Sequence, residues 1–179
     1  ERDDGLARLR NGSVRVLVAT NVAARGLDID GLALVITYEL SPDPSVHTHR
    51  VGRTARASKS GEAIVLVRGE RERARLAAVE EQVGPLPRSE VPAGGPLTHW
   101  SAANRTLLIL GGRRDKIRPG DILGTLVRGV GILAEAVGEI EMTDRRTWVA
   151  VSADEAERAC SGLSKARIKK KRFRVSLLS

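Results

Sequence analysis

Two arginines three residues apart, Arg53 and Arg56, are the residues of this chain whose types and spacing best suit chemistry. They lie in the run HRVGRTARA, from His49 to Ala57, and side chains at i and i+3 on a helical turn point to the same side. Two planar, permanently charged guanidinium groups would then face one point in space. Such a pair can bind a phosphate chain that gains charge during cleavage. The alternative for an isolated pair of this spacing is two solvated surface arginines.

A dense cluster of basic residues in the second half of the chain is the next candidate. Seven of the ten residues from Lys165 to Arg174 are Lys or Arg, and none is acidic. Residues 1–84 carry 13 Lys/Arg against 12 Asp/Glu, whereas residues 85–179 carry 17 against 10. This uneven charge indicates a nucleic-acid partner. A solvated or disordered tail is the alternative, but Ile168 and Phe173 within the cluster favour a packed segment.

Composition excludes several other classes of protein. No run of 18 apolar residues and no signal peptide is present, so we expect no membrane partner and a cytoplasmic protein. The single cysteine, Cys160, excludes an internal disulfide bond. His47 and His49 lack a third ligand at a suitable spacing, so no metal site is expected. Because the first residue is Glu1, we expect the chain to be part of a longer polypeptide.

The first half of the chain alternates short apolar runs with helical segments. Strands are expected at Arg15–Thr20, Ala33–Glu39 and Glu62–Val67. One helix is expected through the arginine run and another from Glu70 to about Val83. This alternation predicts a parallel α/β sheet for residues 1–83. Three strands are few for such a sheet, so we expect the domain to be truncated at its amino-terminal side.

The second half follows a different order of elements. A proline- and glycine-rich stretch predicts a linker over residues 84–104, before a domain over residues 105–179. Its expected elements, in the order β-α-β-β-α-β, are Thr106–Gly112, Asp121–Arg128, Gly138–Met142, Arg146–Ser152, a helix to about Cys160, and Phe173–Leu178. This split pattern is common among RNA-binding domains, although a fold alone does not assign a function.

Two of these segments resemble a known family. VLVATNVAARGLDI (Val16–Ile29) and the run His49–Ala57 resemble motifs V and VI of DEAD-box RNA helicases, in the family's order and spacing. The resemblance covers residues 1 to about 83. It implies a truncated RecA-like domain that acts on ATP, with Mg²⁺ held by a first RecA-like domain. That amino-terminal RecA-like domain of the same polypeptide is therefore an implied partner.

The same resemblance implies a role for individual residues. Arg53 and Arg56 fall at the catalytic positions that contact the terminal phosphates of ATP, and Asp28 falls where an aspartate contacts the ribose. His49 falls at a position that couples the two domains. The positions implied to contact RNA are Arg2, Thr20 and Gly26.

Two departures from the family pattern qualify this reading. Asn21 replaces the usual aspartate, so a contribution of this position to pairing between domains stays open. The chain also contains neither a G-x-x-x-x-G-K-[ST] sequence nor Asp-Glu-Ala-Asp. Without a phosphate-binding loop and a magnesium-binding carboxylate, we expect this chain alone not to hydrolyse ATP.

The second half carries a narrower resemblance. GGRRDKIRPGDILGTL (Gly111–Leu126), together with the closing FRVSLL, resembles the carboxy-terminal domain of the DbpA helicase subfamily. The resemblance covers about Thr106 to Leu178. It implies a domain similar to an RNA-recognition motif that binds a hairpin of large-subunit ribosomal RNA, and hence a role in ribosome assembly.

The residues of this domain suggest how RNA is bound. Trp148 is the only aromatic residue on the expected central strands, where it would stack a base if it faces outward, and a packing role is the alternative. Arg146 should share its face. The remaining RNA-binding candidates are basic residues on either side of the domain: Arg113, Arg114, Lys116, Arg118, Lys165, Arg167, Lys169, Lys170, Lys171 and Arg172.

These observations together predict the carboxy-terminal part of an ATP-dependent DEAD-box RNA helicase that binds structured ribosomal RNA. Two other functions stay open on the residues alone. One is a non-catalytic RNA chaperone or binding module. The other is a DEAD-box helicase that acts on messenger RNA.

Overall fold

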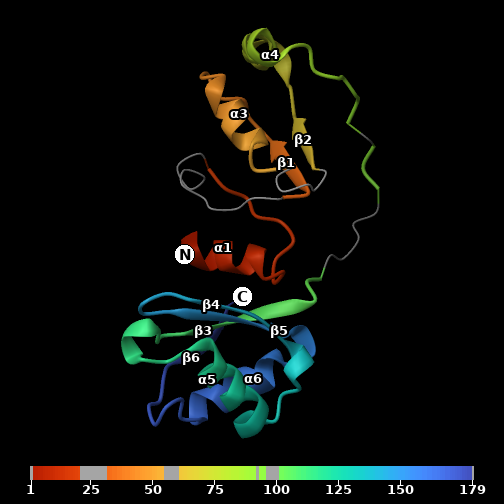
Figure 1. Cartoon of the computed structure of the whole chain (residues 1–179). Helices are drawn as coiled ribbons and strands as arrows, with labels where there is room; N and C mark the ends of the chain where they lie inside the picture. Colours follow the sequence, from red (N-terminus) through yellow and green to blue (C-terminus); the bar gives the residue numbers. More distant parts are fainter. Residues whose placement is uncertain (1, 21–31, 55–60, 92, 96–100, 179) are drawn as a thin grey trace. The chain divides into compact units, whose positions relative to one another are not determined.

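The computed structural model describes residues 2–20, 32–54, 61–91, 93–95 and 101–178. It divides into two compact units, one formed by residues 1–25 with 97–179 and the other by residues 26–96 (Figure 1). Each unit has its own sheet, parallel in the second unit and antiparallel in the first. This division fits the predicted pairing of a parallel α/β segment with an α+β domain.

The second unit contains a short parallel sheet with helices connecting and following its strands. Strands β1 (Leu34–Thr37) and β2 (Glu62–Val65) pair in parallel, with Leu34 opposite Glu62. Helix α3 (Ser45–Val51) lies between them in the chain, and α4 (Gly69–Val83) follows β2. The buried residues of this unit's core are Leu40, Leu76 and Val79. The predicted parallel α/β class is therefore confirmed for this segment.

The expected strand at Arg15–Thr20 is wrong. The backbone here forms neither strand nor helix, and the side chains of Val16 and Val18 are 61% and 93% exposed. A strand needs a neighbour to satisfy its backbone hydrogen bonds. These residues belong to the unit formed with residues 97–179, not to the one that holds β1 and β2.

The first unit is built on a four-stranded antiparallel sheet. Its strands are β3 (Asn104–Ile109), β4 (Val137–Met142), β5 (Thr147–Ser152) and β6 (Val175–Leu178), in the spatial order β4-β5-β3-β6. Short 3₁₀ turns occur at residues 113–115, 134–136 and 153–155. The predicted order β-α-β-β-α-β is confirmed.

Two helices, α5 (Pro119–Gly124) and α6 (Ala156–Lys165), cover one face of this sheet (Figure 1). Alternate residues of the central strands point to them, because successive strand side chains face opposite sides. The fully buried members of the core include Leu107, Ile109, Val149 and Val151 from the strands, and Ile122, Leu126 and Leu163 from the helical side. Burial of each such side chain contributes about 1.5–3 kcal/mol.

The helix expected at Asp121–Arg128 is present but changes its winding halfway. After Gly124 the chain continues as a π-helix from Thr125 to Val130. The π-helix is rare and is frequently found at functional sites. The wider winding presents Thr125 and Arg128 beside the loop that follows α6, and both residues line a pocket there.

Helix α1 (Arg2–Arg10) contacts the sheet through β5 and β4. Leu6 and Ala7 are buried, and Arg10 Nη1 donates to Glu141 Oε1 at 2.6 Å. Asn11 Nδ2 donates to Thr106 Oγ1 at 3.0 Å. Residues 1–25 are thus grouped with residues 97–179, whereas the sequence predicts a domain over residues 1–83. The physical cause is burial of the apolar side of α1 against the sheet.

We expect Gly112→Ala to lower the free energy of unfolding by about 1–3 kcal/mol, the usual cost of overpacking. A Cβ at Gly112 would lie 2.2 Å from the carbonyl oxygen of Thr143, and backbone atoms cannot give way as a side chain does. Gly120→Ala is the matched control, because a Cβ there meets nothing within 4 Å. Urea unfolding of both variants followed by circular dichroism checks this. Equal midpoints would contradict it.

Candidate nucleic-acid interface

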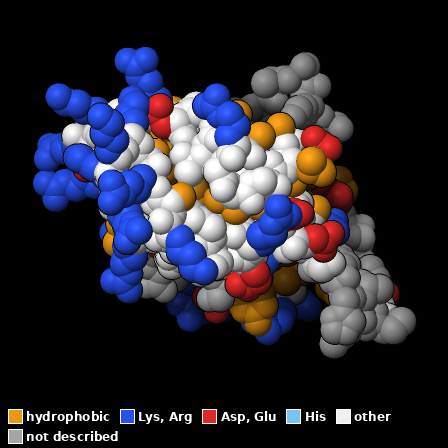
Figure 2. Space-filling model, turned by 90° about the horizontal axis from the view of Figure 1, so that it is seen from below, with side chains coloured by type: hydrophobic (Ala, Val, Ile, Leu, Met, Phe, Trp, Pro, Cys, Tyr) orange, Lys and Arg blue, Asp and Glu red, His pale blue; other side chains and the backbone are white. Residues whose placement is uncertain are grey.

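The ten basic residues predicted at residues 113–118 and 165–172 are all exposed. We call this set the basic surface. Figure 2 shows lysine and arginine side chains gathered along one side of the first unit, whereas the acidic side chains are scattered among other groups. A concentration of one charge on an exposed face attracts the phosphates of a nucleic acid.

Contacts of two lysine side chains join the two segments of the basic surface. Lys169 Nζ donates to the carbonyl oxygen of Lys116 at 2.8 Å and pairs with Asp121 Oδ2 at 3.0 Å. Lys171 Nζ pairs with Asp115 Oδ1 at 3.4 Å. The Lys169 ammonium holds the pKa of the Asp121 carboxyl below its usual range. Residues some fifty positions apart in sequence therefore form one surface.

A tight turn, Ile168–Lys171, presents the central lysines of this surface. The two end residues exchange backbone hydrogen bonds of 2.9 and 3.1 Å. Lys169 and Lys170 have φ angles of 47° and 70°, as both central residues of a type I′ turn require. Asparagine and glycine are the usual residues there, and a lysine in the left-handed region carries a conformational cost. Ile168 is buried and anchors this lysine turn.

Two aspartates fix the loop between β3 and α5. Asp115 accepts a hydrogen bond from the backbone N–H of Gly112 at 3.2 Å, and Asp121 accepts one from Arg118 at 2.7 Å. Both aspartates also pair with lysines of the turn. Reasoning from the sequence missed this double role. The sequence did offer one signal. Each aspartate lies three residues after the residue whose backbone N–H donates to it, and this spacing is typical of helix capping.

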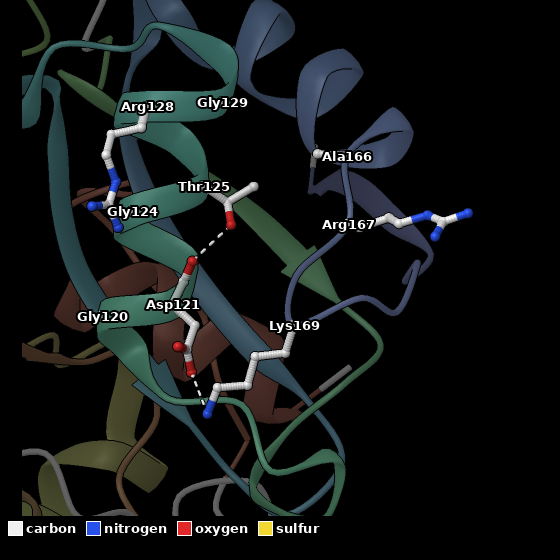
Figure 3. Close-up of a pocket in the computed structure, with 9 residues that line it drawn as sticks. All are labelled: Gly120, Asp121, Gly124, Thr125, Arg128, Gly129, Ala166, Arg167 and Lys169. Atoms are coloured by element: carbon white, nitrogen blue, oxygen red, sulfur yellow. Dashed lines mark hydrogen bonds and ion pairs between the residues drawn. The ribbon is translucent and has the colours of Figure 1, made fainter.

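A shallow pocket of about 440 Å³ opens beside the lysine turn (Figure 3). The residues that line it come from α5, the π-helix and the loop after α6: Gly120, Asp121, Gly124, Thr125, Arg128, Gly129, Ala166, Arg167 and Lys169. Figure 3 shows the Arg128 side chain running back along the helix toward Gly124, whereas Arg167 points away. Arg128 was not a candidate in the sequence, because nothing in the sequence shows that it lines this pocket.

The opposite face of the sheet is not an open stacking surface in this structure. Trp148 is only 2% exposed, and its Nε1 donates to Asp4 Oδ1 at 2.8 Å. Arg146 is exposed, and its Nη1 lies 4.0 Å from Oδ1 of the same Asp4 carboxylate. Trp148 therefore packs against α1, which lies over it, and does not face outward to stack a base. Of the two roles that the sequence left open for Trp148, the structure has the packing role.

The second unit holds part of the predicted ATP site. The backbone of Arg53 is fixed directly after α3, since its N–H donates to Arg50 and its carbonyl oxygen accepts from Leu32, both at 3.1 Å. His49 is exposed on α3. Arg56, Asp28, Gly26 and Asn21 lie outside the described residues. The structure thus leaves the joint geometry of the predicted arginine pair as a prediction.

Among the remaining predicted residues, Arg2 on α1 and Thr20 are both exposed. The residues that the structure describes contain no group of three or more His, Cys, Asp or Glu side chains arranged to hold a metal ion. Within the same residues, no helix has the length and apolar character needed to cross a membrane.

Comparison with known proteins identifies both halves of the chain. Residues 106–177 match the model of the DbpA RNA binding domain, and residues 1–58 match the helicase conserved C-terminal domain. The chain is 44% identical to the ATP-dependent RNA helicase DbpA of Escherichia coli K12, over 99% of this chain and 39% of that protein. It is also 55% identical over 84 residues to the ATP-dependent RNA helicase dbp8 of Neosartorya fischeri, which covers 47% of this chain and 16% of the relative. The chain thus spans well under half the length of these relatives.

Proposed function

Because the chain belongs to the DbpA type of DEAD-box RNA helicases, we propose that it binds structured large-subunit ribosomal RNA through the basic surface. Binding there anchors an ATP-dependent helicase at its substrate during ribosome assembly. A cytoplasmic location is part of this proposal. The observation that carries it is the joining of two distant basic segments by Lys169 and Lys171.

The arrangement of charge suits phosphates of folded RNA. Six lysines and arginines at residues 165–172 and four at residues 113–118 stand exposed around one anchored turn. Contacts to phosphates fix position and orientation without reading sequence. Since α1 covers Trp148, the basic surface is the face of this unit that we expect RNA to reach first.

Anchoring raises the rate of unwinding by proximity. A helicase held on ribosomal RNA meets neighbouring duplexes at an effective concentration set by the linker. Residues 84–91 form neither helix nor strand, as expected of such a linker.

The substrate that the helicase hydrolyses is ATP, with Mg²⁺ bound by the first RecA-like domain. Arg53 and Arg56 would contact the terminal phosphates, Asp28 the ribose, and Arg2, Thr20 and Gly26 the RNA strand. His49 would couple the two domains.

We expect the chain to bind a hairpin of large-subunit ribosomal RNA at least tenfold more tightly than an unrelated duplex of equal length. Binding to either RNA should weaken steeply as salt rises, because each neutralised phosphate releases counterions. Fluorescence anisotropy over a series of KCl concentrations measures both effects. Equal affinities would favour a helicase that acts on messenger RNA or a general RNA chaperone. An RNA affinity that does not change with salt concentration would exclude the basic surface as the site of RNA binding.

A further inference from the structure

Arg75 is a half-buried arginine on α4 that lies outside both segments resembling the helicase motifs, Val16–Ile29 and His49–Ala57. Its Nη1 donates to the carbonyl oxygen of Leu40 at 2.6 Å, although the two residues lie 35 positions apart in the sequence. A hydrogen bond from a charged donor is shorter and stronger than one between neutral groups. Because Leu40 belongs to the segment that joins β1 to α3, this bond ties α4 to the chain that leads to Arg53.

The end of this joining segment nearer to β1 is held firmly. The carbonyl oxygen of Glu39 accepts from Arg50 Nη1 of α3 at 2.9 Å, so two guanidinium groups bind neighbouring carbonyl groups. The Leu40 side chain is 2% exposed and packs with Leu76 and Val79 of α4. Both the polar and the apolar attachment of Leu40 described here therefore come from α4.

The rest of the joining segment, Ser41–Ser45, is stiffened by its own side chains. The backbone N–H of Asp43 donates to Ser41 Oγ at 3.2 Å, and that of Ser45 donates to Asp43 Oδ1 at 2.9 Å. Hydrogen bonds from Ser45 hold the pKa of the Asp43 carboxyl below its usual range. Two prolines in the segment have fixed φ angles. A displacement at Leu40 is therefore passed on to α3.

Helix α3 depends on attachments at its ends because its own packing is weak. It is only seven residues long, and a helix this short is not stable by itself. Among these seven residues, all of which the structure describes, His47 alone is buried. After α3, Arg53 accepts from the N–H of Leu32, and Thr54 Oγ1 donates to the carbonyl oxygen of Leu32. The position of Arg53 thus rests on the attachments at Leu32 and at Leu40.

We propose that Arg75 is a positioning residue for ATP hydrolysis, which holds α3 where Arg53 meets the terminal phosphates. It acts through Leu40 and α3 and touches neither ATP nor RNA. This inference rests on the proposed function, because it assumes that Arg53 contacts ATP. A misplacement of about 1 Å, caused by a change far from the chemistry, can cost roughly a hundredfold in rate. The loss of one attachment of α3 should therefore be measurable.

Substitutions of Arg75 separate its hydrogen bond from its bulk. Arg75→Met keeps a long side chain and removes the donor, whereas Arg75→Lys keeps a charged donor. Methionine and lysine are both good helix formers, so α4 should be retained. Arg71→Met is the matched control, because Arg71 is exposed on the same helix and its substitution changes the net charge equally.

The measurement is RNA-stimulated ATP hydrolysis by a polypeptide that also carries the first RecA-like domain. Arg75→Met should lower kcat by about tenfold or more and change KM for ATP by less than about threefold, because a misplaced Arg53 weakens binding of the transition state most. Arg75→Lys should recover most of the lost rate. Arg71→Met should hydrolyse ATP as the wild type does.

A double variant tests whether Arg75 acts through Arg53. Arg53→Ala removes the group that Arg75 positions, so adding Arg75→Met should slow hydrolysis no further. Substitutions that act independently have additive free energies, and their losses of rate multiply. An Arg75→Met substitution that merely unfolded part of the protein would therefore slow the Arg53→Ala variant as much as the wild type.

Failure of the positioning role and failure of the proposed function give different results. Full turnover by Arg75→Met, an equal loss in Arg71→Met, no recovery in Arg75→Lys, or losses that multiply in the double variant would each overturn the positioning role. Each of these results leaves the proposed function intact. Absence of RNA-stimulated hydrolysis by the wild-type polypeptide would overturn the proposed function, and the positioning role with it.

Discussion

Neutralising the lysine turn should weaken RNA binding strongly while leaving the domain folded. In the variant Lys169→Asn, Lys170→Gly, Lys171→Gln, three positive charges are removed from the basic surface. Each lysine that contacts a phosphate contributes about 1 to the slope of log affinity against log salt. The slope should therefore become shallower by up to about 3, and affinity at low salt should fall by tenfold or more.

The choice of residues separates charge from folding in this variant. Asparagine and glycine are the residues that a type I′ turn prefers. Placing them at positions 169 and 170 therefore removes the conformational cost of holding lysine at a positive φ angle. That gain offsets the loss of exposed ion pairs to Asp115 and Asp121, which are worth at most about 1 kcal/mol each. Stability should stay the same or rise, while RNA affinity falls.

Anisotropy at several KCl concentrations, together with urea unfolding, measures both outcomes. A control variant removes three exposed arginines of the other unit, Arg71, Arg73 and Arg88, by substitution with glutamine. This control changes the net charge equally and should leave the slope almost unchanged. If both triple variants lose the same amount of slope, net charge rather than the basic surface governs binding.

Arg53→Ala should reduce RNA-stimulated ATP hydrolysis by about a thousandfold or more in a polypeptide that also carries the first RecA-like domain. An arginine that contacts the transferred phosphoryl group contributes this much to catalysis. The backbone of Arg53 is held by two hydrogen bonds that do not involve its side chain. Its N–H donates to the carbonyl oxygen of Arg50, and its own carbonyl oxygen accepts from the N–H of Leu32. The substitution should therefore remove the guanidinium without moving α3.

The loss should appear in kcat rather than in KM for ATP, because the group acts mainly on the transition state. Arg53→Lys should recover little, since an ammonium lacks the planar fork of donors. Arg71→Ala, on the exposed side of α4, should hydrolyse ATP normally. The chain by itself should show no RNA-stimulated hydrolysis. A loss of less than tenfold, or turnover by the chain alone that depends on Arg53, would contradict the assignment.

The order of elements could be predicted from sequence because each element carries a local signal. Alternating apolar residues locate β4 and β5, and Pro119 followed by Gly120 and Asp121 marks the start of α5. The apolar run at Arg15–Thr20 carries the same signal and forms no strand here. Whether an apolar run becomes a strand depends on a neighbouring strand, which the run itself does not specify.

The basic residues could be chosen from sequence, but their arrangement could not. The sequence separates residues 113–118 from 165–172, and contacts of Lys169 and Lys171 with Lys116, Asp121 and Asp115 join them. Long-range contacts of this kind depend on the tertiary fold. The burial of Trp148 depends in the same way on α1, which lies far from it in sequence. The π-helix at Thr125–Val130 has no sequence signal that we can name.

The grouping of residues 1–25 with residues 97–179 has a consequence for the order of folding. Residues 26–96 form a compact unit that interrupts the sequence of the other one, so they are synthesised completely before β3 exists. Domains fold as units during synthesis, and the interrupting unit can therefore become compact first. This compaction shortens the loop that must close when α1 meets β5, and the entropic cost of closure falls with loop length. Destabilising the interrupting unit should then slow the assembly of a sheet to which it contributes no strand.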